Sequence, residues 1–135
     1  DVHRQLKSTC QQLKLSINQK DSNYENIHQA ILSGIASHIA IKDEKFDYLG
    51  TRNRKMHIFP GSALFKKPPK TIVALEIAET SSVFARTVAK IELSWVEPWV
   101  QHLISKSYGQ PGWKQKLGLV YAIQTSNLYG LNIST

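Results

Sequence analysis

The chain has 135 residues and is 41% hydrophobic, which suits one domain, or one small domain with flanking pieces, around a real core. Seventeen Lys and Arg residues against ten Asp and Glu residues give a net charge of +7, which favours polyanionic partners. No apolar run approaches the roughly 20 residues of a membrane span, and the N-terminus has no apolar signal core. One cysteine, Cys10, excludes an internal disulfide framework. We therefore expect a cytoplasmic protein without a membrane partner.

Two amphipathic helices are predicted in residues 1–36. Apolar residues recur at spacings of three and four from Val2 to Ile17, and a second such stripe begins at Ile27. Ser22 followed by Glu25 matches a capping box at the start of the second helix. The short polar link predicts a helical hairpin. Because a hairpin alone buries little, and the chain begins inside a helical pattern without Met, we expect it to be part of a longer protein with further helices upstream.

Five short strands are predicted next. The clearest is 71–78, which is rich in β-branched residues and follows Pro68-Pro69. The other four strands are predicted from weaker apolar–polar alternation or from Gly and Pro residues that bound them. They lie at 38–41, 46–49, 55–59 and 83–91. Strands so short and so closely spaced predict a small sandwich or barrel.

The end of the chain is predicted to hold a helix and a hairpin. Ser94 with Glu97 matches another capping box, and the apolar stripe that follows predicts a helix that plugs or flanks the barrel, with its tryptophans in the core. Segments 117–123 and 127–133 could pair across Gln124–Ser126. The predicted organisation is residues 1–36 as a helical end piece, 37–106 as the barrel with its helix, and 107–135 as the start of a following region.

No catalytic pattern is found in this sequence. It has no Gly-rich phosphate loop and no Gly-x-Ser-x-Gly elbow, and its five histidines and one cysteine lack metal-ligand spacing. Glu76 and Glu79 are three apart on a predicted strand, so they point to opposite faces. We expect no enzymatic activity and no cofactor in this chain itself.

A basic tract is the strongest functional signal from composition. No acidic residue lies between Tyr48 and Leu75, yet six Lys and Arg residues fall there. Lys and Arg neutralise phosphates, and aromatic faces accept stacked bases. The nearby rings of Tyr48, His57, Phe59 and Phe65 are each expected in the core more than in a contact. Chance clustering on a solvated face is the alternative to a polyanion-binding patch.

Several motifs in order resemble a known family. They are the run Phe59-Pro60-Gly61-Ser62-Ala63-Leu64-Phe65-Lys66-Lys67-Pro68-Pro69-Lys70, then Glu76, Thr80 and Phe84-Ala85-Arg86. This pattern resembles the oligonucleotide-binding (OB) fold that follows the ratchet domain in DEAH-box RNA helicases of the bacterial HrpA type. Residues 27–34 resemble the last ratchet helix of that branch, and 95–98 and 128–131 fit as well. The resemblance implies a mostly β fold: a five-stranded OB-fold-like barrel preceded by a helical hairpin and followed by a helix and a β-hairpin.

The resemblance also implies a division of labour. Two RecA-like domains elsewhere in such helicases use ATP and Mg²⁺, while the ratchet and OB-fold domains roof a channel for single-stranded RNA. The barrel touches RNA mainly through backbone contacts. Carried onto this sequence, the candidate RNA-binding residues are Arg52, Arg54, Lys55, His57, Lys66, Lys67 and Lys70. Arg86 is expected either to contact RNA or to pair with Glu76 or Glu79.

The expected partners are single-stranded RNA, the remaining helicase domains and a possible protein cofactor, with the chain itself a monomer. The alternative function is a protein-docking module that binds the helicase motor or a regulatory cofactor. A third, weaker hypothesis is an independent single-strand-binding protein. The expectation that this chain is part of a longer protein counts against it.

Overall fold

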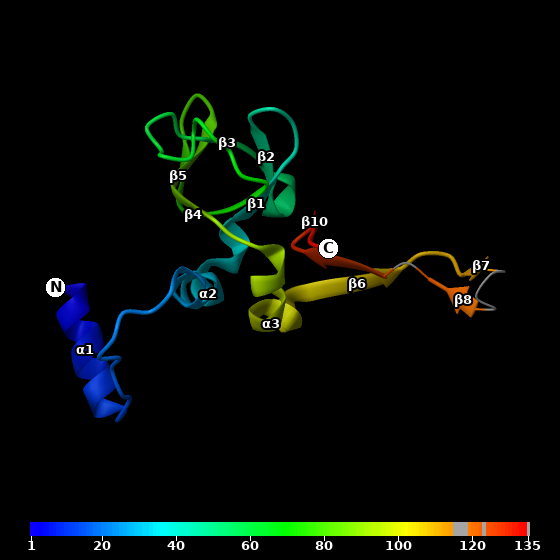
Figure 1. Ribbon diagram of the computed structural model, residues 1–135. Coiled ribbons are helices and arrows are strands. Elements are labelled where there is room, and N and C mark those ends of the chain that lie inside the picture. Colours follow the sequence, from blue (N-terminus) through cyan, green and yellow to red (C-terminus); the bar gives the residue numbers. More distant parts are fainter. Residues whose placement is uncertain (115–118, 123, 135) are drawn as a thin grey trace.

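The computed structural model describes residues 1–114, 119–122 and 124–134. Its centre is a closed five-stranded barrel (Figure 1). The strands are β1 (Ile39–Lys42), β2 (Asp47–Gly50), β3 (Lys55–Ile58), β4 (Thr71–Glu79) and β5 (Val83–Lys90). The predicted five strands and their closure into a barrel are therefore confirmed.

Strand β4 closes the barrel. The order around it is β1-β2-β3-β5-β4, and β4 pairs antiparallel with β1 on one side and with β5 on the other. All neighbours are antiparallel except β3 and β5, which run parallel. Closure leaves this sheet without a free edge for pairing with other chains.

The barrel interior is filled by alternate residues of each strand, as the period of two requires. Large side chains alternate with small ones, so that a narrow barrel can be packed. The buried set is Ala40, Tyr48, Met56, Ile58, Ile72, Ala74 and Ala85.

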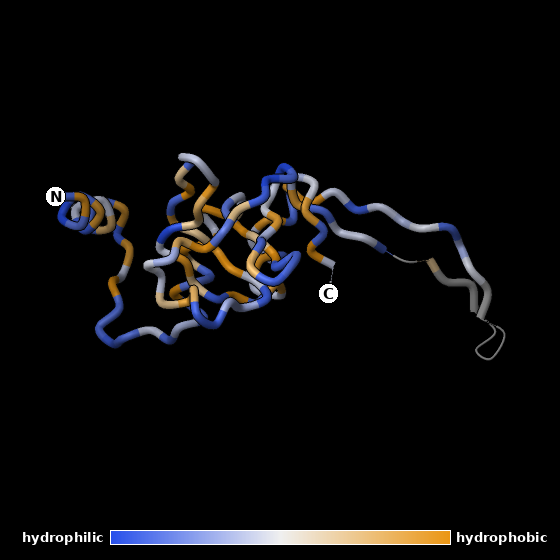
Figure 2. The backbone as a smooth tube through the Cα atoms, turned by 90° about the horizontal axis from the view of Figure 1, so that it is seen from above, coloured by the Kyte–Doolittle hydropathy of each residue, from blue (hydrophilic) through white to orange (hydrophobic). Residues whose placement is uncertain are grey.

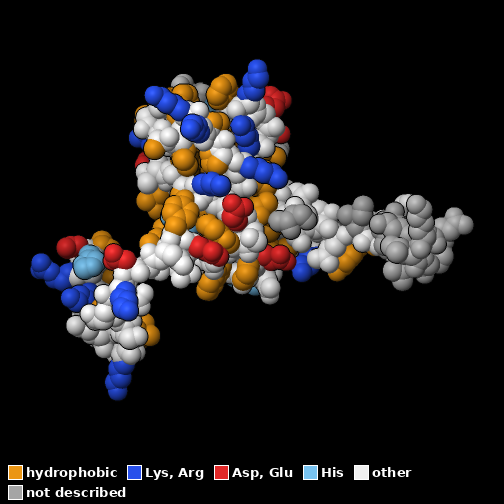
Figure 3. Space-filling model, viewed as in Figure 1, with side chains coloured by type: hydrophobic (Ala, Val, Ile, Leu, Met, Phe, Trp, Pro, Cys, Tyr) orange, Lys and Arg blue, Asp and Glu red, His pale blue; other side chains and the backbone are white. Residues whose placement is uncertain are grey.

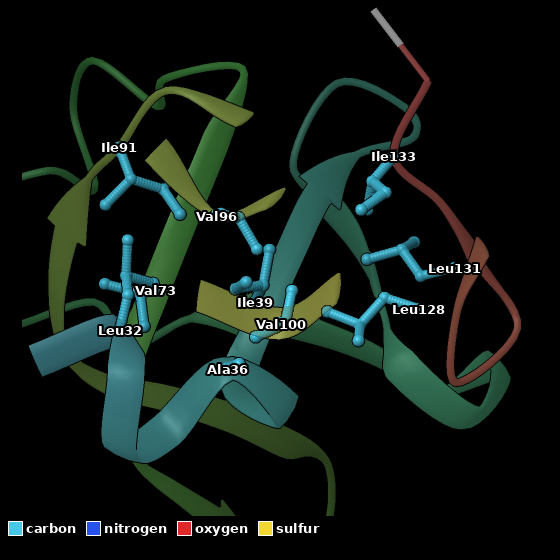
Figure 4. Close-up of a cluster of buried hydrophobic side chains, with 10 residues drawn as sticks. All are labelled: Leu32, Ala36, Ile39, Val73, Ile91, Val96, Val100, Leu128, Leu131 and Ile133. Carbon is cyan, nitrogen blue, oxygen red and sulfur yellow. The ribbon is translucent and has the colours of Figure 1, made fainter. Parts of the chain in front are cut away.

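A second core lies outside the barrel wall (Figure 4). Ile39 and Val73 point outward from β1 and β4 into this core, where they meet side chains from α2 (Tyr24–Ile35) and α3 (Glu97–Val100). The C-terminal strands β9 (Gln124–Leu128) and β10 (Leu131–Asn132) complete it. One core thus draws residues from all three segments of the predicted organisation.

The chain after α3 forms two small sheets. Strand β6 (Ile104–Tyr108) pairs with β9, which also pairs with β10. Strands β7 (Gly112–Lys114) and β8 (Leu119–Tyr121) pair with each other. Figure 1 shows β6 running away from the barrel towards β7 and β8, while β10 lies back beside the barrel.

The N-terminal helices form but do not pack as the predicted hairpin. Helix α1 (Val2–Gln12) has no buried residue and stands apart from α2 in both views (Figures 1 and 2). It ends before Ile17 because Lys14 takes a left-handed conformation, with φ 56°, so the link to α2 is longer than predicted. The N-cap of α2 is Asn23 rather than Ser22: its Oδ1 accepts a 2.8 Å hydrogen bond from the Asn26 amide.

The predicted helix after Ser94 is also shorter than its pattern suggested. Helix α3 has four residues between 3-10 turns, no side chain caps it, and Ile104 already belongs to β6. Val96 and Val100 are buried as expected, but Trp99 is 48% exposed and lies outside the core. Its indole Nε1 donates to Gln29 Oε1 at 3.1 Å, which satisfies the polar end of the ring at the surface.

The C-terminal hairpin turns at a different place from the prediction. Gln124–Ser126 lies inside β9, and the chain reverses at Tyr129-Gly130, where both residues have positive φ. Two such residues make the primed turn that suits the twist of a two-residue hairpin. Residues 117, 118 and 123 of the predicted partner strand lie outside the described residues.

Truncation of Ile72 to Ala tests the barrel register. This side chain is fully buried in the interior, so we expect the free energy of unfolding to fall by about 2–5 kcal/mol in chemical denaturation. Leu75 on the same strand is 59% exposed, and Leu75→Ala is the matched control, with a change within about 0.5 kcal/mol. Equal losses for the two variants would contradict this register.

Candidate nucleic-acid interface

Three of the predicted basic residues lie on or next to β3, and each meets an acidic side chain. Arg54 lies 3.4 Å from Glu79, Lys55 lies 4.0 Å from Asp43, and His57 Nδ1 lies 3.0 Å from Asp47 Oδ1. These three acids lie outside the acid-free tract in sequence, and the folding of the barrel places them next to β3. Exposed pairs of this kind are weak, but a phosphate at β3 must compete with a carboxylate.

Arg52 has a different surrounding. Its guanidinium carbon lies 5.0 Å from the centre of the Tyr129 ring, and its backbone N–H donates to the Tyr129 carbonyl at 2.7 Å. Arg52 and Asn53 both have left-handed backbone conformations, which turn the chain sharply between β2 and β3. Arg52 therefore joins the barrel to the turn between β9 and β10.

The remaining basic residues lie in residues 59–70, which connect β3 to β4 and are called here the lysine loop. Lys66, Lys67 and Lys70 are exposed. Within the described part of the chain, none of the three has an acidic oxygen within 4.0 Å. Their charges are thus the most available of the predicted set for a phosphate group.

The barrel holds both ends of the lysine loop. At the start, the Phe59 amide donates to the Ala85 carbonyl at 3.0 Å, and Ser62 stabilises the following turn. At the end, the Tyr48 hydroxyl donates to the Pro69 carbonyl, and the Lys42 amide donates to the Lys70 carbonyl at 2.8 Å. The lysines are therefore presented by an anchored segment.

Arg86 does not form the predicted ion pair. Glu79 pairs with Arg54 instead, and no contact within 4.0 Å joins Arg86 to Glu76, although the two are cross-strand neighbours. The guanidinium carbon of Arg86 lies 4.4 Å from the centre of the Phe59 ring. Arg86 thus supports the first residue of the lysine loop by a cation–π contact.

An apolar pocket of about 350 Å³ lies beside the lysine loop. Its lining residues, from both loops and strands of the barrel, are Phe46, Tyr48, His57, Ile58, Pro60, Phe65, Pro68 and Phe84. Tyr48 is buried as predicted, but Phe65, also expected in the core, is 38% exposed at this pocket.

Sequence reasoning did not single out the pocket itself. Prolines on both sides of an aromatic residue within a basic loop are the signal that could have indicated it. The whole set could not be predicted from the sequence, because its members come from two loops and three strands that only the fold brings together.

Charge on the visible face is unevenly distributed. In Figure 3, several Lys and Arg side chains gather on the barrel, while most acidic side chains of that view lie lower, towards the helices. No cluster of three His, Cys, Asp or Glu residues suited to a metal ion occurs within the described residues. No helix among them is long and apolar enough to cross a membrane.

Comparison with known proteins identifies the family. Residues 27–104, which include every strand of the barrel, match the family model described as the oligonucleotide/oligosaccharide-binding (OB)-fold. The chain belongs to this family. Strands 2 and 3 of an OB fold, together with the loops that join strands 1 to 2 and 4 to 5, commonly form its ligand-binding side. Here that side includes Phe46 and His57, and the lysine loop, which joins β3 to β4, borders it through the shared pocket.

Two curated relatives extend the match beyond the OB fold. The chain is 46% identical over 134 residues to the ATP-dependent RNA helicase HrpA homolog of Haemophilus influenzae, and 43% identical over 134 residues to the ATP-dependent RNA helicase HrpA of Escherichia coli. Each alignment covers 98% of this chain and 10% of the relative. The chain thus spans about a tenth of their length, and the predicted resemblance to the HrpA branch is confirmed.

A solved structure shares the fold. The crystal structure of the E. coli DExH-box NTPase HrpB aligns with a TM-score of 0.64 at 12% identity, over 95% of this chain and 16% of that chain. At such low identity the likeness concerns the fold alone. It extends to nearly the whole chain, so the barrel and its flanking elements recur together.

The Tyr48 hydroxyl is the buried link between the barrel interior and the lysine loop of this OB fold. Burial raises the pKa of Tyr48 from 10.0 to about 12. The phenol therefore stays protonated well above neutral pH and remains a hydrogen-bond donor to Pro69. This contact fixes the end of the loop nearest Lys70.

Replacement of Tyr48 by Phe tests this link. The variant removes the donor to the Pro69 carbonyl. We expect the free energy of unfolding, measured in urea at neutral pH, to fall by about 1 kcal/mol. Tyr108, 68% exposed on β6, supplies the control Tyr108→Phe, with a change within about 0.5 kcal/mol.

The same variant should change the response to alkaline pH. Between pH 10 and 12 the unfolded wild-type chain loses the Tyr48 proton while the folded chain keeps it. Stability should therefore fall as pH rises through this window. Tyr48→Phe should show a shallower fall than the wild type, and parallel curves would contradict the assignment.

Proposed function

We propose that this chain is a nucleic-acid-contacting accessory domain of an ATP-dependent RNA helicase, and that its lysine loop binds the phosphates of single-stranded RNA. The observation that carries the proposal is the set of three exposed lysines on an anchored loop of an OB fold, none of which meets an acidic oxygen within 4.0 Å among the described residues. Support comes from the similarity to two RNA helicases over almost the whole chain.

In this proposal the chain grips the strand and the rest of the helicase does the chemical work. The motor domains of the parent protein hold ATP and Mg²⁺, and this OB fold helps to roof the channel through which RNA passes. Phosphate contacts fix the position of a strand but carry no sequence information. Binding is therefore independent of the RNA sequence, which suits a motor that must move along any strand.

The seven candidate residues are not expected to contribute equally. Lys66, Lys67 and Lys70 have no ion pair to break within the part of the chain that the structure describes, and they should contribute most. Arg54, Lys55 and His57 must first leave their carboxylates, and Arg52 must leave the Tyr129 ring. Their contributions should be smaller.

A second candidate function is protein docking. Helix α1 exposes Val2 and Leu6, and helix α2 exposes Ile27 and Ile31, so apolar side chains face solvent on both. Exposed apolar patches mark interaction surfaces. The remaining helicase domains, or a protein cofactor, are the partners this surface would suit.

Charge reversal of Lys66 and Lys67 to Glu tests RNA binding through the lysine loop. Binding of a labelled uridine decamer, followed by fluorescence anisotropy, should weaken. The plot of log affinity against log salt should flatten by about 1.4, because each lost phosphate contact is worth about 0.7 in single strands. The matched control reverses Lys7 and Lys14 on the N-terminal segment, which changes net charge equally and should leave the slope unchanged.

Two results would contradict RNA binding through the lysine loop. One is wild-type binding that does not respond to salt. The other is an unchanged RNA affinity in the loop variant combined with weaker pull-down of the excised motor domains, which would mean that the lysine loop itself docks on the motor domains.

A further inference from the structure

We propose that the aromatic pocket beside the lysine loop holds one nucleobase of the strand whose phosphates lie on Lys66 and Lys67. This inference rests on the proposed function and adds a base contact to the phosphate contacts. The pocket is lined by rings and prolines from both sides: Phe46 from the β1–β2 loop, His57 and Phe84 from neighbouring strands, and Pro60, Phe65 and Pro68 from the lysine loop.

The exposure of aromatic side chains here needs a reason. Phe46 is 61% exposed at the pocket, and Phe65 is also partly exposed. Both flank a cavity of about 350 Å³ whose lining also includes the buried Tyr48. Ligand sites in proteins are typically concave and apolar and start at about 300 Å³. The size and lining suit one flat aromatic group.

Charge at the rim identifies the kind of ligand. Phe65 is followed by Lys66 and Lys67, and Phe46 follows Lys45. None of these three lysines has an acidic partner within 4.0 Å among the described residues. The acid that follows Phe46, Asp47, is held by His57 Nδ1 at 3.0 Å, and Glu44, which precedes Lys45, is not among the residues that line the pocket. An apolar hollow with a positive rim matches a nucleotide, which joins a flat base to an anionic phosphate.

The pocket should accept any base. Of its lining residues only Tyr48 and His57 carry polar side-chain atoms, and the contacts described above engage the Tyr48 hydroxyl with Pro69 and His57 Nδ1 with Asp47. Little remains to read the hydrogen-bonding edge of a base. Stacking on aromatic rings tolerates every base, since each has a π face.

The test compares two single strands with equal numbers of phosphates: a uridine decamer and an abasic ribose-phosphate decamer. Phe46→Ala should weaken binding of the uridine decamer about tenfold, the usual effect of losing one stacked base, and leave the abasic decamer unchanged. Phe46→Tyr keeps a ring and should retain affinity. Tyr108→Ala, at an exposed ring on β6, should leave both affinities unchanged. Phe65→Ala repeats the test from the opposite wall.

Each other outcome has a distinct meaning. If both decamers bind with steep salt dependence and Phe46→Ala affects neither, phosphate binding stands and the base pocket is wrong. If neither decamer binds the wild type, the proposed function fails and this inference with it. If Phe46→Ala weakens only the pull-down of motor domains, the pocket is occupied by protein, which overturns the nucleobase assignment.

Discussion

Strand β4 determines where the proposed binding surface lies, because it pairs with β1 and β5 at once. Its alternation separates two cores: Ile72 and Ala74 fill the barrel, while Val73 enters the outer core with α2, α3 and the C-terminal strands. The lysine loop runs directly into its first residue, Thr71. A shift of β4 by one residue would exchange its two faces and would move the end of the loop as well.

In this OB fold, acidic residues that lie outside the basic tract in sequence are close to it in space. The basic tract has no acidic residue within it, yet barrel pairing brings Asp43, Asp47 and Glu79 to its β3 portion. The lysine loop escapes this neutralisation because it extends beyond the paired strands. The net charge of a tract therefore favours polyanionic partners, but only the fold shows which of its cations meet a carboxylate among the described residues.

The five strands could be predicted because β-branched runs and proline or glycine punctuation are local signals. The lysine loop could be predicted for the same reason. Helix lengths could not: Lys14 ends α1 through a left-handed conformation, and α3 is a single short turn among 3-10 turns, whereas apolar periodicity continues past both ends. The ion pairs and the aromatic pocket depend on register between distant strands, which no local pattern encodes.

Anchoring of the lysine loop supports its proposed role in binding. Hydrogen bonds from Tyr48 and from the Lys42 amide fix its end, and the Phe59 amide and ring fix its start. A loop already ordered before binding loses little conformational entropy when a strand arrives, so more of the contact free energy appears as affinity. Because Phe65 and Lys66 are adjacent on this one segment, a base and its phosphate would be received together, in a geometry that the barrel sets before the RNA arrives.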